Sequence, residues 1–158
     1  MGLVLRPPAP LDLAPGEQTL FLAGSIEMGT AALWQEEVER AFASLPVTIL
    51  NPRRLDWDSS WRQSADDTRF REQVVWELSA LEQATQIVLY LDPATRAPVS
   101  LLEMGLFARS GRLIVCCPEG YFRKGNVDIV CSRYNIRVAA TLAELIETAR
   151  AAFVPYSR

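Results

Sequence analysis

The chain has 158 residues, 49% of them hydrophobic and 22% charged, and carries a net charge of −3. This length and balance predict one soluble globular domain with a core of its own. The negative charge argues against nucleic acid as a partner, because neutralising phosphates requires a basic face, and no apolar run reaches the ~20 residues that cross a membrane.

The N-terminal stretch and the cysteines both indicate a cytoplasmic protein. Residues 1–18, MGLVLRPPAPLDLAPGEQ, are expected to form an extended, proline-rich arm ahead of a single domain over 19–158. The arm lacks a charged segment followed by a continuous apolar one, so we predict no signal peptide. Cys116 and Cys117 adjoin inside a strand-like run, where neighbouring side chains point to opposite faces, as expected of packing thiols in a reducing compartment.

Strand-like apolar runs alternate along the chain with segments of helical period. The predicted strands are 18–26, 47–52, 86–91, 112–118 and 136–140. The predicted helices are 31–45, 68–84, 100–111 (ended by Gly111) and 142–153. Unbroken apolar strands separated by helices indicate a parallel sheet covered on both faces. The predicted fold is therefore α/β, a flavodoxin- or Rossmann-like three-layer α/β/α sandwich whose parallel sheet has about five strands.

Two stretches, 53–67 and 119–135, are too long for simple connections, and long loops in compact domains are usually functional or disordered. In open α/β sheets, ligands bind outside the carboxyl ends of the strands. That rule predicts one cleft surrounded by AGSI (23–26, with Gly24 and Ser25), NPRRLDWD (51–58), DPATRAPVSLLE (92–103) and PEGYFRKGN (118–126).

Glu103 stands out because it follows a buried strand and lies among leucines and a methionine, in PVSLLEMG. Ser100 and Glu103 fit the S-x-x-E capping box, in which the two side chains satisfy backbone N–H groups at a helix start. The alternative is a reactive carboxylate at the mouth of the cleft. The residues by themselves leave both interpretations open.

The sequence contains no histidine. This excludes Ser-His-Asp and Cys-His catalysis and histidine metal sites. Any chemistry must then rest on carboxylates, hydroxyls, amides and bound substrate, and we expect neither a metal nor a cofactor.

The loop 53–67 offers charged and aromatic candidates. It begins with two arginines closely followed by two aspartates: Arg53, Arg54, Asp56 and Asp58. Paired arginines suit a phosphate clamp, but local ion pairing at the surface is the favoured interpretation. Trp57 and Trp61 either stack on a flat ring or cover the core beneath the loop, and the sequence leaves both open.

Three further positions allow an ordinary and a functional interpretation. Gly24 either permits a tight turn with close approach of the backbone or serves a sugar-binding role. Glu77, on the helix predicted at 68–84, would ordinarily lie on a solvated face, but it is beside the apolar stripe, and its other flank can reach the cleft. Asn126, in KGNVD, is ordinarily a turn residue, because asparagine tolerates left-handed conformations.

The chain contains, in this order, FLAGSI, NPRRLDWD, QVVWEL, PVSLLEMG and CPEGYFRKGNVDIV. Together these stretches resemble the nucleoside 2-deoxyribosyltransferase family, particularly its bacterial deoxyribosyltransferase-like branch, from about residue 19 to residue 131. The resemblance implies a flavodoxin-like fold, oligomers built from dimers, and active sites completed by a neighbouring subunit. The implied reaction exchanges the base on a 2′-deoxynucleoside through a covalent deoxyribosyl–enzyme intermediate, so nucleosides and free bases are the expected partners.

The resemblance assigns three residues directly. Glu103, in its L-E-M-G setting, matches the family's nucleophilic glutamate. Glu77 falls where the family has an aspartate on the preceding helix. Asn126 matches the asparagine lent across the interface to the 5′-hydroxyl and the nucleophile, which implies at least a homodimer.

Three positions depart from the family pattern. Phe21 replaces a tyrosine that touches the nucleophile, Ala97 replaces an aspartate that handles the base, and Asp128 replaces an interface methionine. Candidate substitutes for the base-handling acid are Asp92 and the pair Asp56 and Asp58.

The chemistry agrees with this assignment. Cleavage of a C–N glycosidic bond passes through an oxocarbenium-like centre at C1′, which a nearby carboxylate stabilises and traps. The first turn of a helix favours the charged form of Glu103, and Ser100 and the helix start would orient it. Glu77 or Asp92 is the candidate acid that protonates the leaving base.

The leading hypothesis is therefore transfer of 2-deoxyribose between bases through a glutamyl intermediate. One alternative is an N-glycoside hydrolase of nucleosides or nucleoside 5′-monophosphates on the same scaffold. Another is a non-catalytic nucleotide-sensing module, which the departures at Phe21 and Ala97 keep open. Related hydrolases tend to have an arginine after GSI, whereas this chain has Glu27, which favours nucleosides over nucleotides.

Overall fold

The computed structural model describes residues 2–27, 32–56 and 60–154. Its elements are β1 (Val4–Leu5), β2 (Thr19–Gly24), α1 (Trp34–Phe42), β3 (Thr48–Leu50), α2 (Thr68–Gln83), β4 (Gln86–Tyr90), α3 (Pro98–Phe107), β5 (Leu113–Cys116), α4 (Lys124–Arg133), β6 (Arg137–Ala139) and α5 (Leu142–Ala151). Within these residues the strands form one parallel sheet of six, in the order β1-β3-β2-β4-β5-β6.

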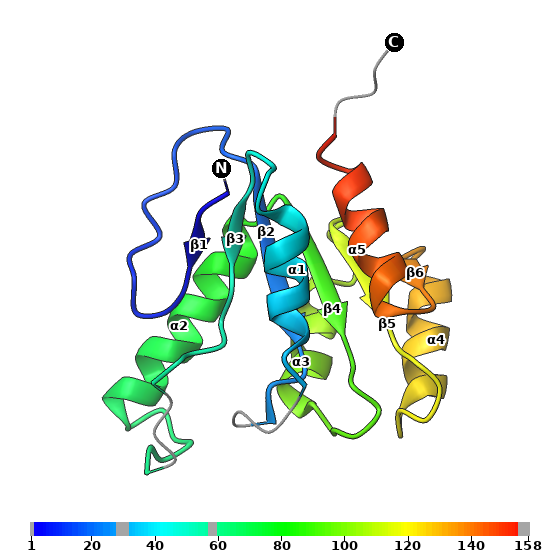
Figure 1. The fold of residues 1–158 in the computed structure, drawn as a ribbon. Helices are drawn as coiled ribbons and strands as arrows, with labels where there is room; N and C mark the ends of the chain where they lie inside the picture. Colours follow the sequence, from blue (N-terminus) through cyan, green and yellow to red (C-terminus); the bar gives the residue numbers. More distant parts are fainter. Residues whose placement is uncertain (1, 28–31, 57–59, 155–158) are drawn as a thin grey trace.

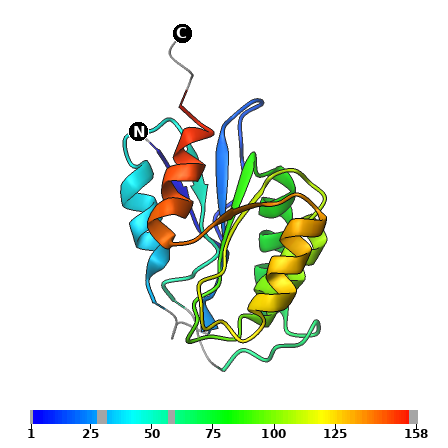
Figure 2. The ribbon, with the colours of Figure 1, turned by 90° about the vertical axis from the view of Figure 1, so that its right-hand side faces the viewer.

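Helices cover both faces of the sheet, α1 and α5 on one side and α2, α3 and α4 on the other (Figure 1, Figure 2). Consecutive residues of β2 alternate between the two cores: Leu20 and Leu22 pack with α1, and Phe21 and Ala23 with α2 and α3. Because both faces of such strands are buried, polar and apolar residues do not alternate along them, and the strands occur as unbroken apolar runs. The predicted three-layer α/β/α fold is confirmed.

The sheet has one strand more than predicted because the N-terminal arm contributes β1, which pairs with β3. Beyond β1 the arm crosses α2, where the Trp76 indole Nε1 donates to the Ala9 carbonyl at 2.8 Å. Leu11 and Leu13 pack against the same core cluster as Trp76. The arm is thus fixed to the fold by backbone pairing, a hydrogen bond and apolar contact.

Two predictions of local structure were wrong. The stretch 119–135, predicted as a loop, contains α4, whose buried side chains are Val127 and Cys131, one turn apart. The helix predicted at 100–111 runs from Pro98 to Phe107, so Gly111 does not end it. Gly111, with φ of 72°, instead lies in the turn that leads into β5.

Candidate active site

The strand order reverses between β2 and β4, which is where open α/β sheets bind ligands. β2 ends at Gly24, with φ of 140°, and a Cβ built there would lie 2.2 Å from the Tyr90 carbonyl oxygen. Only glycine lets the two strand ends approach this closely. The interpretation of Gly24 as a close-approach position is confirmed, and its sugar-binding role stays a prediction.

Ser25 and Asp92 join the ends of these two strands. The fully buried Ser25 accepts hydrogen bonds at its Oγ from the Asp92 backbone N–H, at 2.9 Å, and from Thr95 Oγ1, at 2.7 Å. The Asp92 carboxylate accepts from the backbone N–H groups of Ala94, at 2.9 Å, and Ala32, at 3.4 Å. Both side chains therefore hold the connection from β4 to α3 in place at the switch point.

The start of α3 differs from the predicted capping box. The helix begins at Pro98, so Ser100 is its third residue, and Ala97 is the N-cap in a left-handed conformation with φ of 47°. Glu27, three residues after the end of β2, supplies the cap instead. Its carboxylate accepts from the backbone N–H groups of Arg96, at 3.0 Å, and Ala97, at 2.5 Å. The capping-box interpretation of Ser100 and Glu103 was wrong because proline in the first turn starts the helix earlier.

Glu103 consequently lies in the second turn of α3, past the N–H groups of the first turn. It is 8% exposed, and the buried Ser100 lies on the same helix, one turn before it. Glu77 of α2 is partly buried and is close enough for its charge to act on Glu103. Two of the predicted site residues thus lie on different helices of the same layer, within range of each other's charge.

The environment of this pair disfavours ionisation. Burial raises the pKa of Glu103 to about 8, and the charge of Glu77 adds to the rise. Burial also raises the pKa of Glu77 to about 7, against the opposing effect of a hydrogen bond from Gln73. Because like charges repel, ionisation of one of these carboxylates disfavours ionisation of the other.

Gln73 is a residue of this site that the sequence analysis missed. It is 5% exposed and lies one turn before Glu77 on α2. Its Nε2 donates to Glu77 Oε1 at 2.7 Å and to the carbonyl of Pro52 at 3.0 Å. The available signal was the i, i+4 spacing of an amide and an acid, which places both side chains on one helix face.

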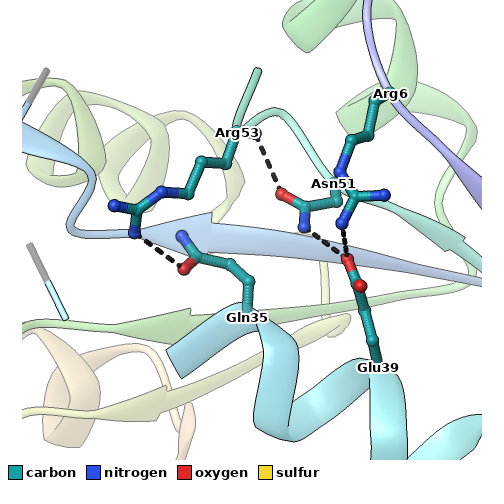
Figure 3. A network of polar contacts seen from close by, with 5 residues as sticks. All are labelled: Arg6, Gln35, Glu39, Asn51 and Arg53. Carbon is teal, nitrogen blue, oxygen red and sulfur yellow. Dashed lines mark hydrogen bonds and ion pairs between the residues drawn. The ribbon is translucent and has the colours of Figure 1, made fainter. Parts of the chain in front are cut away.

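Pro52 follows β3, where a polar network holds the chain (Figure 3). Asn51 donates through Nδ2 to Glu39 Oε1 at 2.6 Å and accepts at Oδ1 from the Arg53 backbone N–H at 2.9 Å. Arg6 of the arm pairs with the same Glu39 oxygen at 2.5 Å, and Arg53 donates to Gln35 Oε1 at 3.2 Å. The segment that carries the Pro52 carbonyl is therefore fixed to α1 and to the arm.

Phe21 is fully buried on the sheet face that α2 and α3 cover. It therefore lies in the layer of Glu77 and Glu103, as the resemblance implies. The phenyl ring supplies no hydroxyl to that layer, so it can contribute packing and exclusion of water. Its proposed contact with substrate stays a prediction.

The loop after β3 is described in part, and Trp57 and Asp58 lie outside the described residues. Arg54 binds Asp56 through two hydrogen bonds of 3.0 Å each, which confirms local ion pairing for these two residues. The buried Trp61 has the Arg54 guanidinium 4.7 Å from its ring centroid. Of the two interpretations of Trp61, this geometry supports a cover over the core.

Asn126 and Asp128 both project from α4 as exposed residues. Asp128 pairs with Lys124, one turn earlier, at 3.1 Å. Asn126 is available to a neighbouring molecule, and its role across an interface stays a prediction.

Two features are absent from the described residues. None of their helices is long and apolar enough to cross a membrane. Nor do their cysteine, aspartate and glutamate side chains form a group of three or more that could hold a metal ion.

Comparisons with known proteins agree with this fold. Among solved structures, a conserved protein from Enterococcus faecalis V583 has a similar fold, with a TM-score of 0.59 at 13% sequence identity over 85% of this chain and 98% of that chain. No curated protein matches the chain. The model of the family described as nucleoside 2-deoxyribosyltransferase like matches residues 17–121, which include Gln73, Glu77 and Glu103. The chain therefore belongs to the nucleoside 2-deoxyribosyltransferase-like family.

Proposed function

We propose that this protein cleaves the N-glycosidic bond of a 2′-deoxynucleoside and transfers the deoxyribose to another base. A carboxylate oxygen of Glu103 bonds to C1′ as the C1′–N bond breaks, and the electron pair of that bond leaves with the base. Glu77 gives the departing base its proton. An incoming base then attacks C1′, displaces Glu103, and returns a proton to Glu77.

The observation that carries this proposal is the pair formed by the partly buried Glu77 and the buried Glu103. The reaction needs one ionised carboxyl as nucleophile and one protonated carboxyl as acid. Mutual repulsion and burial favour a state of the pair with a single proton near neutral pH. In the free protein Glu103, whose pKa is the higher, holds that proton, so the proposal requires the proton to pass from Glu103 to Glu77 when the substrate binds. The chain has no histidine that could take either part, and its family supports nucleosides as the substrate class.

Other predicted site residues have supporting roles in this proposal. Ser25 and Asp92 shape the connection that leads into α3, and Gly24 allows it to approach β2. Ser100 packs beside Glu103, and Phe21 excludes water beneath the reacting sugar. In this proposal, the loop that carries Asp56 and Trp57 contacts the base of the nucleoside.

Glu27 supports nucleosides over nucleoside 5′-monophosphates as substrates. Its carboxylate already occupies the backbone N–H groups of Arg96 and Ala97 at the start of α3. A helix start is a common anion site, and here the protein fills it with its own negative charge. A phosphate brought to the same place would be repelled.

We also propose a homodimer in which Asn126 reaches the partner's site. Exposed apolar side chains accompany Asn126 on this side of the sheet: Val99, Leu102 and Leu106 on α3, and Ile129 on α4. Such an array favours burial against another molecule. Light scattering on a size-exclusion column tests this: a mass of twice 17.6 kDa or more is expected, and a monomer would contradict it.

The function is tested by chromatography of reactions with 2′-deoxyinosine, with and without free adenine. Formation of 2′-deoxyadenosine only when adenine is present is the expected result. Glu103→Gln should abolish it, whereas Glu72→Gln, which alters an exposed carboxylate on α2, should not. Free base released at the same rate without acceptor would make the protein a hydrolase. No turnover of 2′-deoxynucleosides would refute the enzymatic proposal and favour a sensing module.

A further inference from the structure

We infer that Gln73 is a positioning residue that decides which oxygen of Glu77 carries the proton. The inference deepens the proposed function, in which Glu77 is the acid. It follows from two hydrogen bonds, both made by the same amide nitrogen of Gln73.

The Pro52 carbonyl fixes the orientation of the Gln73 amide. A carbonyl oxygen only accepts hydrogen bonds, so the group 3.0 Å from it must be the amide nitrogen. Turning the amide over would bring the Gln73 oxygen against the Pro52 oxygen. The network around Asn51 holds Pro52 in place (Figure 3), so this constraint does not relax easily.

The second N–H of the Gln73 amide then points at Glu77 Oε1, 2.7 Å away. An oxygen that faces a donor at this distance has to accept. A proton on Oε1 would compete with that N–H for the same space, so the proton of neutral Glu77 is held on Oε2. Oε2 is therefore the oxygen that delivers a proton to a leaving base.

This arrangement leaves the Gln73 Oε1 atom buried and, among the described residues, without a hydrogen-bond partner. An unpaired buried acceptor is destabilising, and an apolar side chain of the same size would avoid it. Apolar packing therefore does not explain a glutamine at this position, whereas its two hydrogen bonds, to the Pro52 carbonyl and to Glu77, do.

Glu77 also interacts with the charge of Glu103, which lies on α3. Pro52, at the end of β3, contributes a neutral carbonyl, and Gln73 a neutral amide. A donor to the carboxylate stabilises its ionised form. Loss of Gln73 should therefore raise the pH at which Glu77 titrates.

The test is a carbon-13 NMR titration of the glutamate side-chain carboxyls, with the Glu77 signal assigned from Glu77→Gln. In Gln73→Met the midpoint of Glu77 should rise by about one pH unit. Gln86→Met is the matched control. Gln86 is also buried and donates to a backbone carbonyl, but it is the first residue of β4 and so lies away from the carboxyl strand ends that form the site. An unchanged midpoint in Gln73→Met would overturn the inference.

A second measurement uses the unaltered protein and so does not depend on the folding of a variant. One side-chain amide proton of Gln73 should shift in step with the titration of Glu77, and the shift should vanish in Glu77→Gln. Gln73 amide signals that do not change during that titration would contradict the hydrogen bond to Glu77. Both NMR tests are independent of turnover, so a failure of the proposed function remains distinguishable from a failure of this inference.

Kinetics separate proton delivery from a structural role. Gln73→Met should lose at least about tenfold in kcat/KM with 2′-deoxyinosine, whose base needs a proton to leave. It should lose little with 4-nitrophenyl 2-deoxyriboside, whose leaving group needs none. Equal losses on both substrates would assign Gln73 to packing alone.

Discussion

Replacement of the buried Glu103 by glutamine should make the protein more stable, and increasingly so as the pH rises. The folded state holds the Glu103 proton up to about pH 8, whereas an unfolded glutamate releases it near its ordinary pKa of 4.5. Between these values the folded state binds more protons than the unfolded state, so the free energy of unfolding falls as pH increases. Glutamine does not ionise and avoids this loss.

The size of the effect follows from the raised pKa. Each pKa unit corresponds to about 1.4 kcal/mol, so a rise from 4.5 to about 8 makes ionisation in the folded state unfavourable by about 5 kcal/mol. Between pH 5 and pH 9 the wild type should therefore lose about 4 kcal/mol of unfolding free energy through Glu103. Glu77 is present in both proteins, so the difference between them isolates Glu103 and its coupling to Glu77.

Urea unfolding of the wild type and Glu103→Gln at pH 5 and pH 9 measures this directly. The variant's advantage in unfolding free energy should widen by about 4 kcal/mol between the two conditions. Glu72→Gln, at an exposed position on α2, should show a nearly constant difference. An advantage for Glu103→Gln that stays constant within about 1 kcal/mol would refute the burial argument.

Three further changes test contacts that hold the fold. Gly24→Ala should destabilise the protein by about 3 kcal/mol or more in urea unfolding, because the new Cβ would meet the Tyr90 carbonyl at 2.2 Å. Trp76→Phe removes the hydrogen bond to Ala9, and limited proteolysis should then cut the arm faster without a comparable change elsewhere. Asp67→Ala removes the side chain that caps α2; thermal unfolding should show a loss of about 1 kcal/mol.

The sequence predicted the parts of the fold in which local pattern and burial agree. β2 and β4 are buried on both faces, so their apolar runs identify both the strands and the parallel sheet. α4 was missed because it buries little besides Val127 and Cys131 and exposes Ile129. β1 was missed because its two residues precede two prolines, a context that favours an extended arm.

The candidate site was predictable where single residues carry the chemistry. Glu77 and Glu103 were named from the sequence, and in the structure they lie within range of each other's charge. The start of α3 was not predictable from its own sequence, because Glu27, which caps it, comes from another part of the chain. Gln73 was missed because its importance depends on the Pro52 carbonyl, a backbone group that no side-chain pattern reveals.

The pairing of β1 with β3 also bears on how the protein avoids aggregation. An edge strand offers unpaired N–H and C=O groups to which another chain can add. Without β1 that edge would be β3, a run of three buried residues, Thr48–Leu50. With β1 in place the edge is two residues long, and the prolines that soon follow have no N–H to donate. The arm thus protects the edge of the sheet, because it leaves a second molecule few backbone groups with which to extend it.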